Sequence, residues 1–385
     1  MLAAPLHAEL LATFQTTRGN VVVELQYDKA PQAVGNFITL SQGTRSRITA
    51  NGAVTNAPLY VGEKFFRVVN GPAENPAFKI AQTGSGTGIN SGGPGYVFRD
   101  EFDPALTHVP YVLSMANNGV HTNGSQIFFT GNGSILHLDN MHTIFGLVTD
   151  PASRTVIDDI IGAGNDATTI NAVTISRTDP DAVAFDEFEQ DLPECQPVPG
   201  HLEVIPATKA DYLFNDPLKP GTVLQCYRSP DLTAWTRLGE RYHGTGQIGF
   251  SSAMLDSATL PKAFYNLSMV TYPDALAPAS FANRAMLLDI FGNQTLLLEF
   301  NASGTAGIAT YSQEPGNPTA FQLNSYTGSA YAATLVIQSS NLGSLRIRAV
   351  LDGEKELHIL GTHNVDQYNG LFWQAATSGG LTLTK

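Results

Sequence analysis

The sequence contains few cysteines and no long apolar segment. Only two cysteines, Cys195 and Cys226, occur among the 385 residues, so the chain is not a disulfide-rich scaffold. They are compatible either with one disulfide in an oxidising compartment or with two buried thiols in any compartment. No run of about 18 or more apolar residues is present, so we expect no membrane span. Residues 1–14 lack a basic leader and a full apolar core, and therefore make a poor signal peptide.

Charged residues are also scarce, and most of them are acidic. They make up 14% of the chain, and the formal net charge is −13. Clusters of Lys and Arg are missing, and because phosphate binding needs such clusters we expect no nucleic-acid partner. The hydrophobic fraction of 43% indicates a globular protein, while 36 Gly and 22 Pro indicate many turns and short strands. The composition therefore predicts a β-rich, multidomain protein.

Several motifs of metal, cofactor and hydrolase sites do not occur. The nine histidines show neither His-Glu-x-x-His nor Cys-pair spacing, and there is no Gly-x-Ser-x-Gly elbow. The glycine-rich stretch 84–95 lacks the Gly-Lys-Ser/Thr ending of a phosphate loop. We therefore predict no metal, no cofactor and no hydrolytic nucleophile.

The first part of the chain alternates short apolar runs with turns and contains two helix patterns. Residues 13–27 read as two strands joined at Arg18-Gly19-Asn20. Helices are expected from Pro31 to about residue 43 and over 151–161, each opened by a proline, and a closing strand over 169–177. This pattern fits a closed antiparallel β-barrel capped by two helices, and also several α+β folds.

The character of the chain changes after residue 178. Seven acidic residues and no basic ones occur between Asp179 and Glu194, which predicts an acidic, solvated linker over 179–200. Residues 201–385 show strands and turns without convincing helices, including a hairpin over 285–300 around Gly292-Asn293. We therefore predict a first domain over 1–178, the linker over 179–200, and an all-β region over 201–385, which divides at about 201–275 and 276–385 as one option.

Six short motifs in the first half carry the functional information. In chain order they are Phe65-Phe66-Arg67, Ile80-Ala81-Gln82, Asp100-Glu101-Phe102, Met115-Ala116-Asn117, the run 123–128 and His142. Each motif alone is weak, but together their order and spacing from about Thr13 to Thr178 resemble a cyclophilin, and the acidic turn is typical of bacterial members. The resemblance implies a mainly β protein with a cyclophilin-like barrel, followed by the all-β C-terminal region.

The resemblance also implies an activity, peptidyl-prolyl cis-trans isomerisation, and a set of site residues. Rotating an X-Pro amide costs ~18–20 kcal/mol because its resonance is lost. A guanidinium near the prolyl nitrogen favours the twisted amide, and Arg67 is the residue that the resemblance assigns to this catalytic role. The substrate-binding residues that it assigns are Phe66, Ile80, Gln82, Ala116, Asn117, Asn118, Gln126, Phe128, His137, Leu138 and His142.

The chain departs from the family pattern at four places. Phe66 stands where His is usual, His137 where many members have Trp, and Asn118 where a small residue is common. The segment 68–79 is longer than usual, which leaves open whether Phe78 or Lys79 fills the adjacent pocket position. We therefore expect an altered pocket rim and a weak response to the family's cyclic-peptide inhibitor, with the isomerase reaction kept.

Three functions remain open at this point. The first is a rotamase that assists protein folding by acting on proline-containing peptides or unfolded proteins. The alternatives are a catalytically weak proline-peptide binding module and an envelope or matrix adhesin that uses the C-terminal β region. The last follows from the segments 229–236 and 263–267, which resemble small β modules of bacterial envelope and secreted proteins. This resemblance favours a periplasmic or secreted location with an envelope or surface partner, and a cytoplasmic location is the alternative.

Overall fold

The protein forms two compact units, each of which is described by itself. The structure is a computed structural model that describes residues 10–89, 91–119, 122–198, 200–205, 209–216, 222–243, 249–256, 263–273, 284–290, 294–311, 315–328, 332–339, 343–352, 356–362 and 366–374. The first unit takes in the chain up to Phe214 together with Val223–Tyr242 and Ser251–Thr271. The second comprises Asn215–Thr222, His243–Phe250 and Tyr272–Lys385. Most of residues 1–14, which were judged a poor signal peptide, lie outside the described residues.

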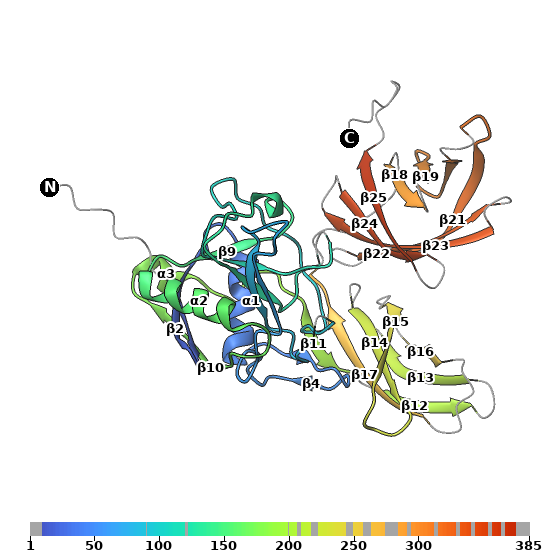
Figure 1. Cartoon of the computed structure of the whole chain (residues 1–385). Helices are drawn as coiled ribbons and strands as arrows, with labels where there is room; N and C mark the ends of the chain where they lie inside the picture. Colours follow the sequence, from blue (N-terminus) through green and yellow to red (C-terminus); the bar gives the residue numbers. More distant parts are fainter. Residues whose placement is uncertain are drawn as a thin grey trace. The chain divides into compact units, whose positions relative to one another are not determined.

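An eight-stranded sheet forms the framework of the first unit (Figure 1). Its strands, in spatial order, are β10 (Ile170–Arg177), β1 (Leu10–Thr16), β2 (Gly19–Leu25), β9 (Ile144–Leu147), β7 (Val112–Met115), β8 (Ile127–Thr130), β6 (Lys79–Thr83) and β5 (Arg67–Asn70). The paired strands are antiparallel, and β1 and β2 form the predicted hairpin. A bridge between Lys64 and Thr169, beside the edge strands β5 and β10, curls the sheet round on itself. The mainly β, cyclophilin-like fold class is confirmed.

The two predicted helices are present. Helix α1 (Pro31–Gln42) begins at its proline and ends at Gly43, whose φ of 69° is left-handed and therefore suits glycine. Helix α2 (Pro151–Ala163) begins where the Asp150 carboxylate accepts hydrogen bonds from the backbone N–H groups of Ala152 and Ser153. Helix α2 packs on β2, and α1 packs on β10.

Aromatic side chains from the sheet and from α1 build the core. Phe14 lies with its ring centroid 5.4 Å from that of Phe37 and 5.2 Å from that of Phe129, and Phe37 lies 5.6 Å from Phe145. All four side chains are fully buried. Such ring pairs contribute about 0.5–1.5 kcal/mol each beyond the area that they bury. This core fixes α1 against the strands that carry the functional residues.

The acidic turn after the glycine-rich loop caps helix α1. Ala30 offers no side-chain cap. Instead, the Glu101 carboxylate accepts hydrogen bonds from Gln32 N at 3.0 Å and from Ala33 N at 2.9 Å. Burial raises the pKa of Glu101 from 4.5 to about 7, even though these two N–H groups favour the charged form.

The Glu101 pKa predicts a pH-dependent stability. Because the native state binds the proton more tightly than the unfolded chain, this stabilisation is full below pH 4.5 and is lost as the pH rises through about 7. We expect titration of Glu101 to lower the unfolding free energy of the wild type by about 3 kcal/mol over that range. This contribution to the pH dependence should be absent in Glu101→Gln. Urea denaturation, followed by the helical circular dichroism of the first unit, measures it; identical pH dependences for the two proteins would contradict it.

The span predicted as a solvated linker, 179–200, contains regular structure. It holds helix α3 (Pro180–Ala184) and strand β11 (Glu194–Pro197), and its Leu192 side chain is buried. The guanidinium of Arg177 donates hydrogen bonds to Phe185 O and to the Glu187 carboxylate. Acidic residues of the span are mostly exposed, but the backbone is folded within the first unit. The domain boundaries read from the sequence stay predictions.

The described residues of the predicted all-β region, 201–385, form strands, as predicted, and strand β11 precedes them. One sheet has the order β11, β17 (Phe264–Thr271), β14 (Thr222–Ser229) and β15 (Thr236–His243); another has the order β12 (Gly200–Ile205), β13 (Lys209–Asp216) and β16 (Gly249–Asp256). A closed barrel follows, made of β18 (Arg284–Ile290), β19 (Gln294–Phe300), β20 (Ala306–Tyr311), β21 (Thr319–Gly328), β22 (Ala332–Ser339), β23 (Gly343–Asp352), β24 (Glu356–Thr362) and β25 (Asp366–Gln374). β18 and β19 form the predicted hairpin, whose turn Gly292-Asn293 lies outside the described residues. The short pair β3 (Arg47–Ile48) and β4 (Val54–Thr55) belongs to the first unit.

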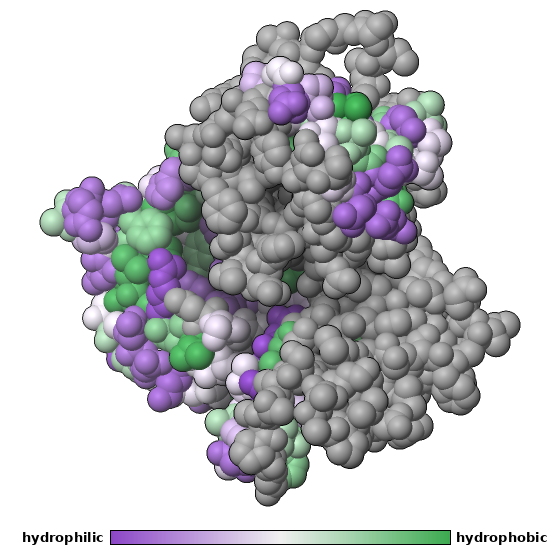
Figure 2. Space-filling model, turned by 90° about the vertical axis from the view of Figure 1, so that its right-hand side faces the viewer, coloured by the Kyte–Doolittle hydropathy of each residue, from purple (hydrophilic) through white to green (hydrophobic). Residues whose placement is uncertain are grey.

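The two cysteines are buried thiols and do not form a disulfide. Burial raises the pKa of Cys195 to about 12, so this thiol stays protonated at neutral pH. Within the described ranges, no helix combines the length and the apolar composition needed to cross a bilayer. On the face shown in Figure 2, the coloured surface mixes hydrophilic and hydrophobic residues.

Candidate active site

A chain of side-chain hydrogen bonds joins the predicted catalytic arginine to two glutamines. Arg67, the first residue of β5, lies opposite Gln82 of β6 in the strand register. Arg67 Nη1 donates to Gln82 Oε1 at 2.9 Å, and Gln82 Nε2 donates to Gln126 Oε1 at 2.8 Å. Gln126 Nε2 in turn donates to the carbonyl of Gly92 at 2.8 Å. Each amide both donates and accepts, so the orientation of the whole chain is fixed.

Beside this chain lies an apolar cluster. Ile80, Phe128 and Ile135 are nearly fully buried, and Val69, Phe78, Ala116 and Leu138 pack against them. The β6–β8 register explains part of this arrangement, because it places Gln82 opposite Phe128. Side chains alternate along a strand, so Ile80 and Gln82 lie on the same face of β6. The predicted residues Ile80, Ala116, Phe128 and Leu138 are thus brought together.

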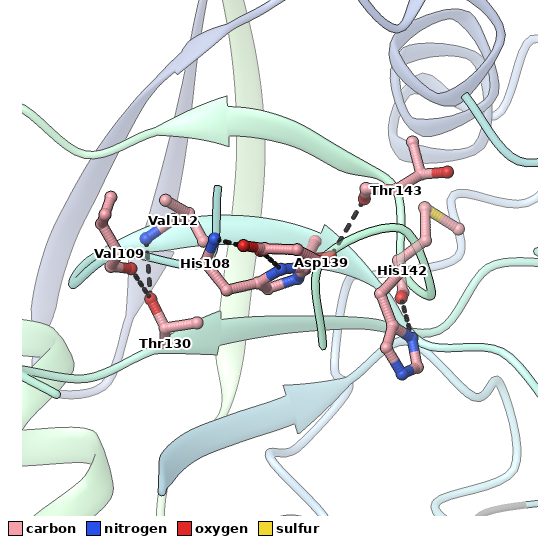
Figure 3. Close-up of polar contacts among 9 residues, drawn as sticks. His108, Val109, Val112, Thr130, Asp139, His142 and Thr143 are labelled. Atoms are coloured by element: carbon pink, nitrogen blue, oxygen red, sulfur yellow. Dashed lines mark hydrogen bonds and ion pairs between the residues drawn. The ribbon is translucent and has the colours of Figure 1, made fainter. Parts of the chain in front are cut away.

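Two histidines flank the Phe128 ring. The His142 ring meets it edge-on, with centroids 5.6 Å apart, and His142 Nδ1 lies 3.0 Å from Met115 O. The His108 ring stacks on Phe128 at 6.0 Å. His108 Nδ1 lies 2.8 Å from Asp139 Oδ1, a contact visible in Figure 3. His108 was not predicted as a site residue, because no motif surrounds it and only the fold brings it to Phe128.

Burial governs the charge of both histidines. It lowers the pKa of His142 from 6.5 and outweighs the opposite effect of the hydrogen bond to Met115 O, and the positive charge of Arg67 lowers this pKa further. Burial also lowers the pKa of His108 and outweighs the opposite effect of Asp139, so the close contact between these two is a hydrogen bond rather than a full ion pair at neutral pH. The site therefore presents neutral imidazoles and one cation, Arg67.

Asn117 supports the loop beside the site. Its Nδ2 donates to Met141 O at 2.8 Å and more weakly to Asp100 Oδ1 at 3.4 Å. Asp100 Oδ1 also accepts from Asn123 Nδ2 at 2.8 Å. The neighbouring Asn118 is exposed, and its backbone N–H donates to Thr122 Oγ1. The Asn117 side chain thus holds the loop, and Asn118 lies at its exposed edge.

Residues that depart from the family pattern lie near the apolar cluster and Arg67. His137 is exposed in the short helix η1 (Leu136–Leu138), and its ring centroid lies 5.9 Å from that of Phe78. Phe78 packs on the apolar cluster, whereas Lys79 Nζ donates to Asn132 Oδ1. Phe78 therefore fills the position that the sequence left open. Phe66, also predicted for the site, is buried beside Arg67.

The comparisons with known proteins assign the family. Residues 11–179 match the cyclophilin type peptidyl-prolyl cis-trans isomerase/CLD family. The probable peptidyl-prolyl cis-trans isomerase A of Mycobacterium leprae (strain TN) is 45% identical over 174 residues, which cover 43% of this chain and 91% of that protein. The chain belongs to the cyclophilin-type peptidyl-prolyl cis-trans isomerase family, and the predicted family and enzyme class are confirmed.

A second curated relative agrees with this assignment. Peptidyl-prolyl cis-trans isomerase B of Streptomyces anulatus is 42% identical over 154 residues, which cover 40% of this chain and 83% of that protein. A crystal structure of a cyclophilin type peptidyl-prolyl cis-trans isomerase of Cryptosporidium parvum shares 26% identity, with a TM-score of 0.36 over 44% of this chain and 99% of that chain. The family match ends at residue 179, so the strands from β11 onward lie outside it.

Proposed function

We propose that this chain catalyses the cis–trans isomerisation of X-Pro bonds in peptides or unfolded proteins, with Arg67 as the catalytic residue. One observation carries the proposal: the exposed Arg67 guanidinium is held by Gln82 beside a buried apolar cluster. This arrangement combines a fixed positive charge with a surface for a proline ring. Neither a nucleophile nor a base is needed, because no covalent bond is broken.

The proposed mechanism stabilises the twisted amide. In the planar ground state the prolyl nitrogen shares its lone pair with the carbonyl, and the barrier to rotation is ~18–20 kcal/mol. At the twisted geometry the nitrogen regains its lone pair and accepts a hydrogen bond from Arg67. Because this bond forms only in the transition state, it lowers the barrier without tightening ground-state binding. Arginine stays charged at any working pH, so the interaction is always available.

The proposed pocket holds the proline ring while the preceding carbonyl rotates. Ile80, Phe128, Leu138 and His142 form its wall, and Gln82 with the Asn117 backbone anchors the peptide in an extended conformation. Leu136 and Met141, which are close in sequence to Leu138 and His142, are more than half exposed and in our proposal add apolar contacts for an unfolded client. The remaining predicted contacts, Phe66, Ala116, Asn118, Gln126 and His137, surround the pocket in our proposal.

The neutral state of His142 predicts a pH profile. Its pKa lies below the ordinary 6.5, so the ring is uncharged above that pH and the apolar pocket is intact. We expect kcat/KM to be constant above about pH 6.5 and to fall at lower pH, as charged His142 disrupts packing on Phe128 and repels Arg67. His142→Gln should flatten the profile. Rates from about pH 5 to 8 measure this, and a wild-type rate that falls as the pH rises would contradict it.

Catalysis by the full chain tests the proposal. Uncatalysed prolyl exchange takes tens to hundreds of seconds, so exchange NMR of a proline tetrapeptide with a catalytic amount of protein gives a clear contrast. We expect accelerated exchange. A binding module without turnover would shift the peptide signals in a titration but leave the exchange rate unchanged.

The second part of the proposal concerns the function of the C-terminal β region. The family match stops before its sheets and barrel, so we propose that they bind a client or a surface partner. A periplasmic or secreted location and an envelope partner stay predictions. Cell fractionation with an antibody to this chain measures the first of these.

A further inference from the structure

The strands that follow the family domain touch the glycine-rich loop at two points. Gln225 of β14 donates from Nε2 to the carbonyl of Gly95 at 2.6 Å. Cys195 of β11 lies with its Sγ 3.9 Å from the carbonyl of Pro94. The Gln225 side chain is 1% exposed and that of Cys195 is 3% exposed, so both contacts are buried.

The same short segment of the loop contacts the active site at its other end. The Gly92 carbonyl accepts the hydrogen bond from Gln126. Pro94 lies against Gly124, two residues before Gln126, where a Cβ would stand 3.0 Å from Pro94 Cδ. Residues 92–95 therefore connect β11 and β14 to the Gln126 amide over a span of four residues.

We infer that Gln225 is a positioning residue for the isomerase site. Its hydrogen bond fixes Gly95, the four-residue segment fixes Gly92, and Gly92 orients the chain from Gln126 through Gln82 to Arg67. The inference deepens the proposed function and rests on it. It makes strands beyond the family domain part of the machinery that orients the peptide-binding amides.

The composition of the loop explains why it needs an external support. Gly95 has a φ of 91°, and Gly84, Gly86 and Gly88 also have positive φ values. Glycine visits these conformations freely, so the loop backbone has more conformations to lose than other sequences. A strand residue such as Gln225 offers a fixed anchor. Its amide is itself oriented, because Gln225 Oε1 accepts a hydrogen bond from the Tyr227 hydroxyl at 3.3 Å.

A second contact between the same sheet and the family domain provides a matched control. Asn266 of β17 donates from Nδ2 to Asn51 O at 2.6 Å. Asn51 lies in the turn between β3 and β4, away in sequence from residues 92–95. Ile48 of β3 donates its backbone N–H to Pro94 O at 2.8 Å, so this hairpin contacts the loop as well. Removing the Asn266 amide weakens the attachment of the sheet but leaves the hydrogen bond to Gly95 O in place.

The test compares Gln225→Met with Asn266→Leu in the full-length chain. Methionine keeps the length and most of the volume of glutamine but cannot donate to Gly95 O. For Gln225→Met we expect the KM for a proline tetrapeptide to rise about three- to tenfold, the range that one hydrogen bond supplies, with a smaller fall in kcat. Asn266→Leu should leave both constants unchanged. A variant that merely loses folded protein would show a lower kcat at an unchanged KM.

A second readout separates this inference from the proposed function. The NMR signals of the Gln126 and Gln82 side-chain amides should shift in Gln225→Met and not in Asn266→Leu, whether or not the protein turns over substrate. Catalysis by the wild type with unmoved amide signals and an unchanged KM in Gln225→Met would overturn the positioning role alone. If the wild type does not turn over substrate but the amide signals still shift in Gln225→Met, the positioning role is supported and the isomerase function is rejected.

Discussion

Replacing Arg67 with alanine is expected to lower kcat/KM for prolyl isomerisation by about 10²–10³-fold, the usual cost of removing one transition-state donor. Because the guanidinium acts only on the twisted amide, the loss should fall mainly on kcat, while peptide affinity changes little. The fold should persist, since Arg67 is exposed at the start of β5. Exchange NMR gives the rate, and a peptide titration gives the affinity.

Two further variants sharpen the Arg67 experiment. Arg67→Lys keeps the charge but loses the planar fork of donors that bonds Gln82, so we expect an intermediate rate. Arg18→Ala removes the same charge at the β1–β2 turn, where its Nε donates to Thr168 Oγ1, and should leave the rate unchanged. Equal rates for wild type and Arg67→Ala would reject the mechanism.

Replacing Phe128 with alanine is expected to destabilise the first unit by about 3–5 kcal/mol, as is usual for a buried aromatic side chain. Phe128 is 3% exposed and contacts the rings of both His108 and His142. Its removal leaves a cavity at the wall of the proposed proline pocket. We therefore also expect the remaining folded protein to bind a proline peptide at least tenfold more weakly, which is about 1.4 kcal/mol. Urea denaturation by circular dichroism and a peptide titration measure the two effects.

Ile135→Val is the matched control for Phe128→Ala. Ile135 belongs to the same apolar cluster and is 1% exposed, but it is not a predicted peptide contact. Loss of one methylene should cost about 0.5–1.5 kcal/mol and leave the peptide affinity unchanged. A Phe128→Ala protein that binds the peptide as tightly as the wild type would show that this ring does not form the pocket.

The elements that the sequence predicted well are those with local signals. Helices α1 and α2 begin at prolines and carry their own apolar faces, and Gly19, with a positive φ, begins β2 directly after the turn from β1. The glutamine and arginine of the site were assigned by motif, and the β5–β6 register then explains how residues fifteen positions apart come to bond. Local signals were sufficient for the helices and the hairpin, whereas the family resemblance supplied Arg67 and Gln82.

Other features depend on contacts between distant residues and carry no local signal. His108 reaches Phe128 only through the packing of the sheet. Glu101 was recognised as part of an acidic turn, but its bond to Gln32 spans 69 residues, so its role as a helix cap could not be read from the sequence. The contact between Gln225 and Gly95 spans 130 residues. The span predicted as a linker holds α3 and β11, because Phe185 packs on the Tyr27 ring and Leu192 is buried.

The pairing of β1 with β10 determines when, during synthesis of the chain, β1 gains its second neighbouring strand. Leu10 pairs with Arg177, so β1 meets one of its two neighbours only after the residues up to β10 have been made. At typical synthesis rates this interval is roughly 10 to 30 s. During it, β1 presents an unpaired edge, which is a site for association with other chains. A nascent chain of this protein is therefore expected to need chaperone protection until β10 emerges, even though the finished domain belongs to a family of folding catalysts.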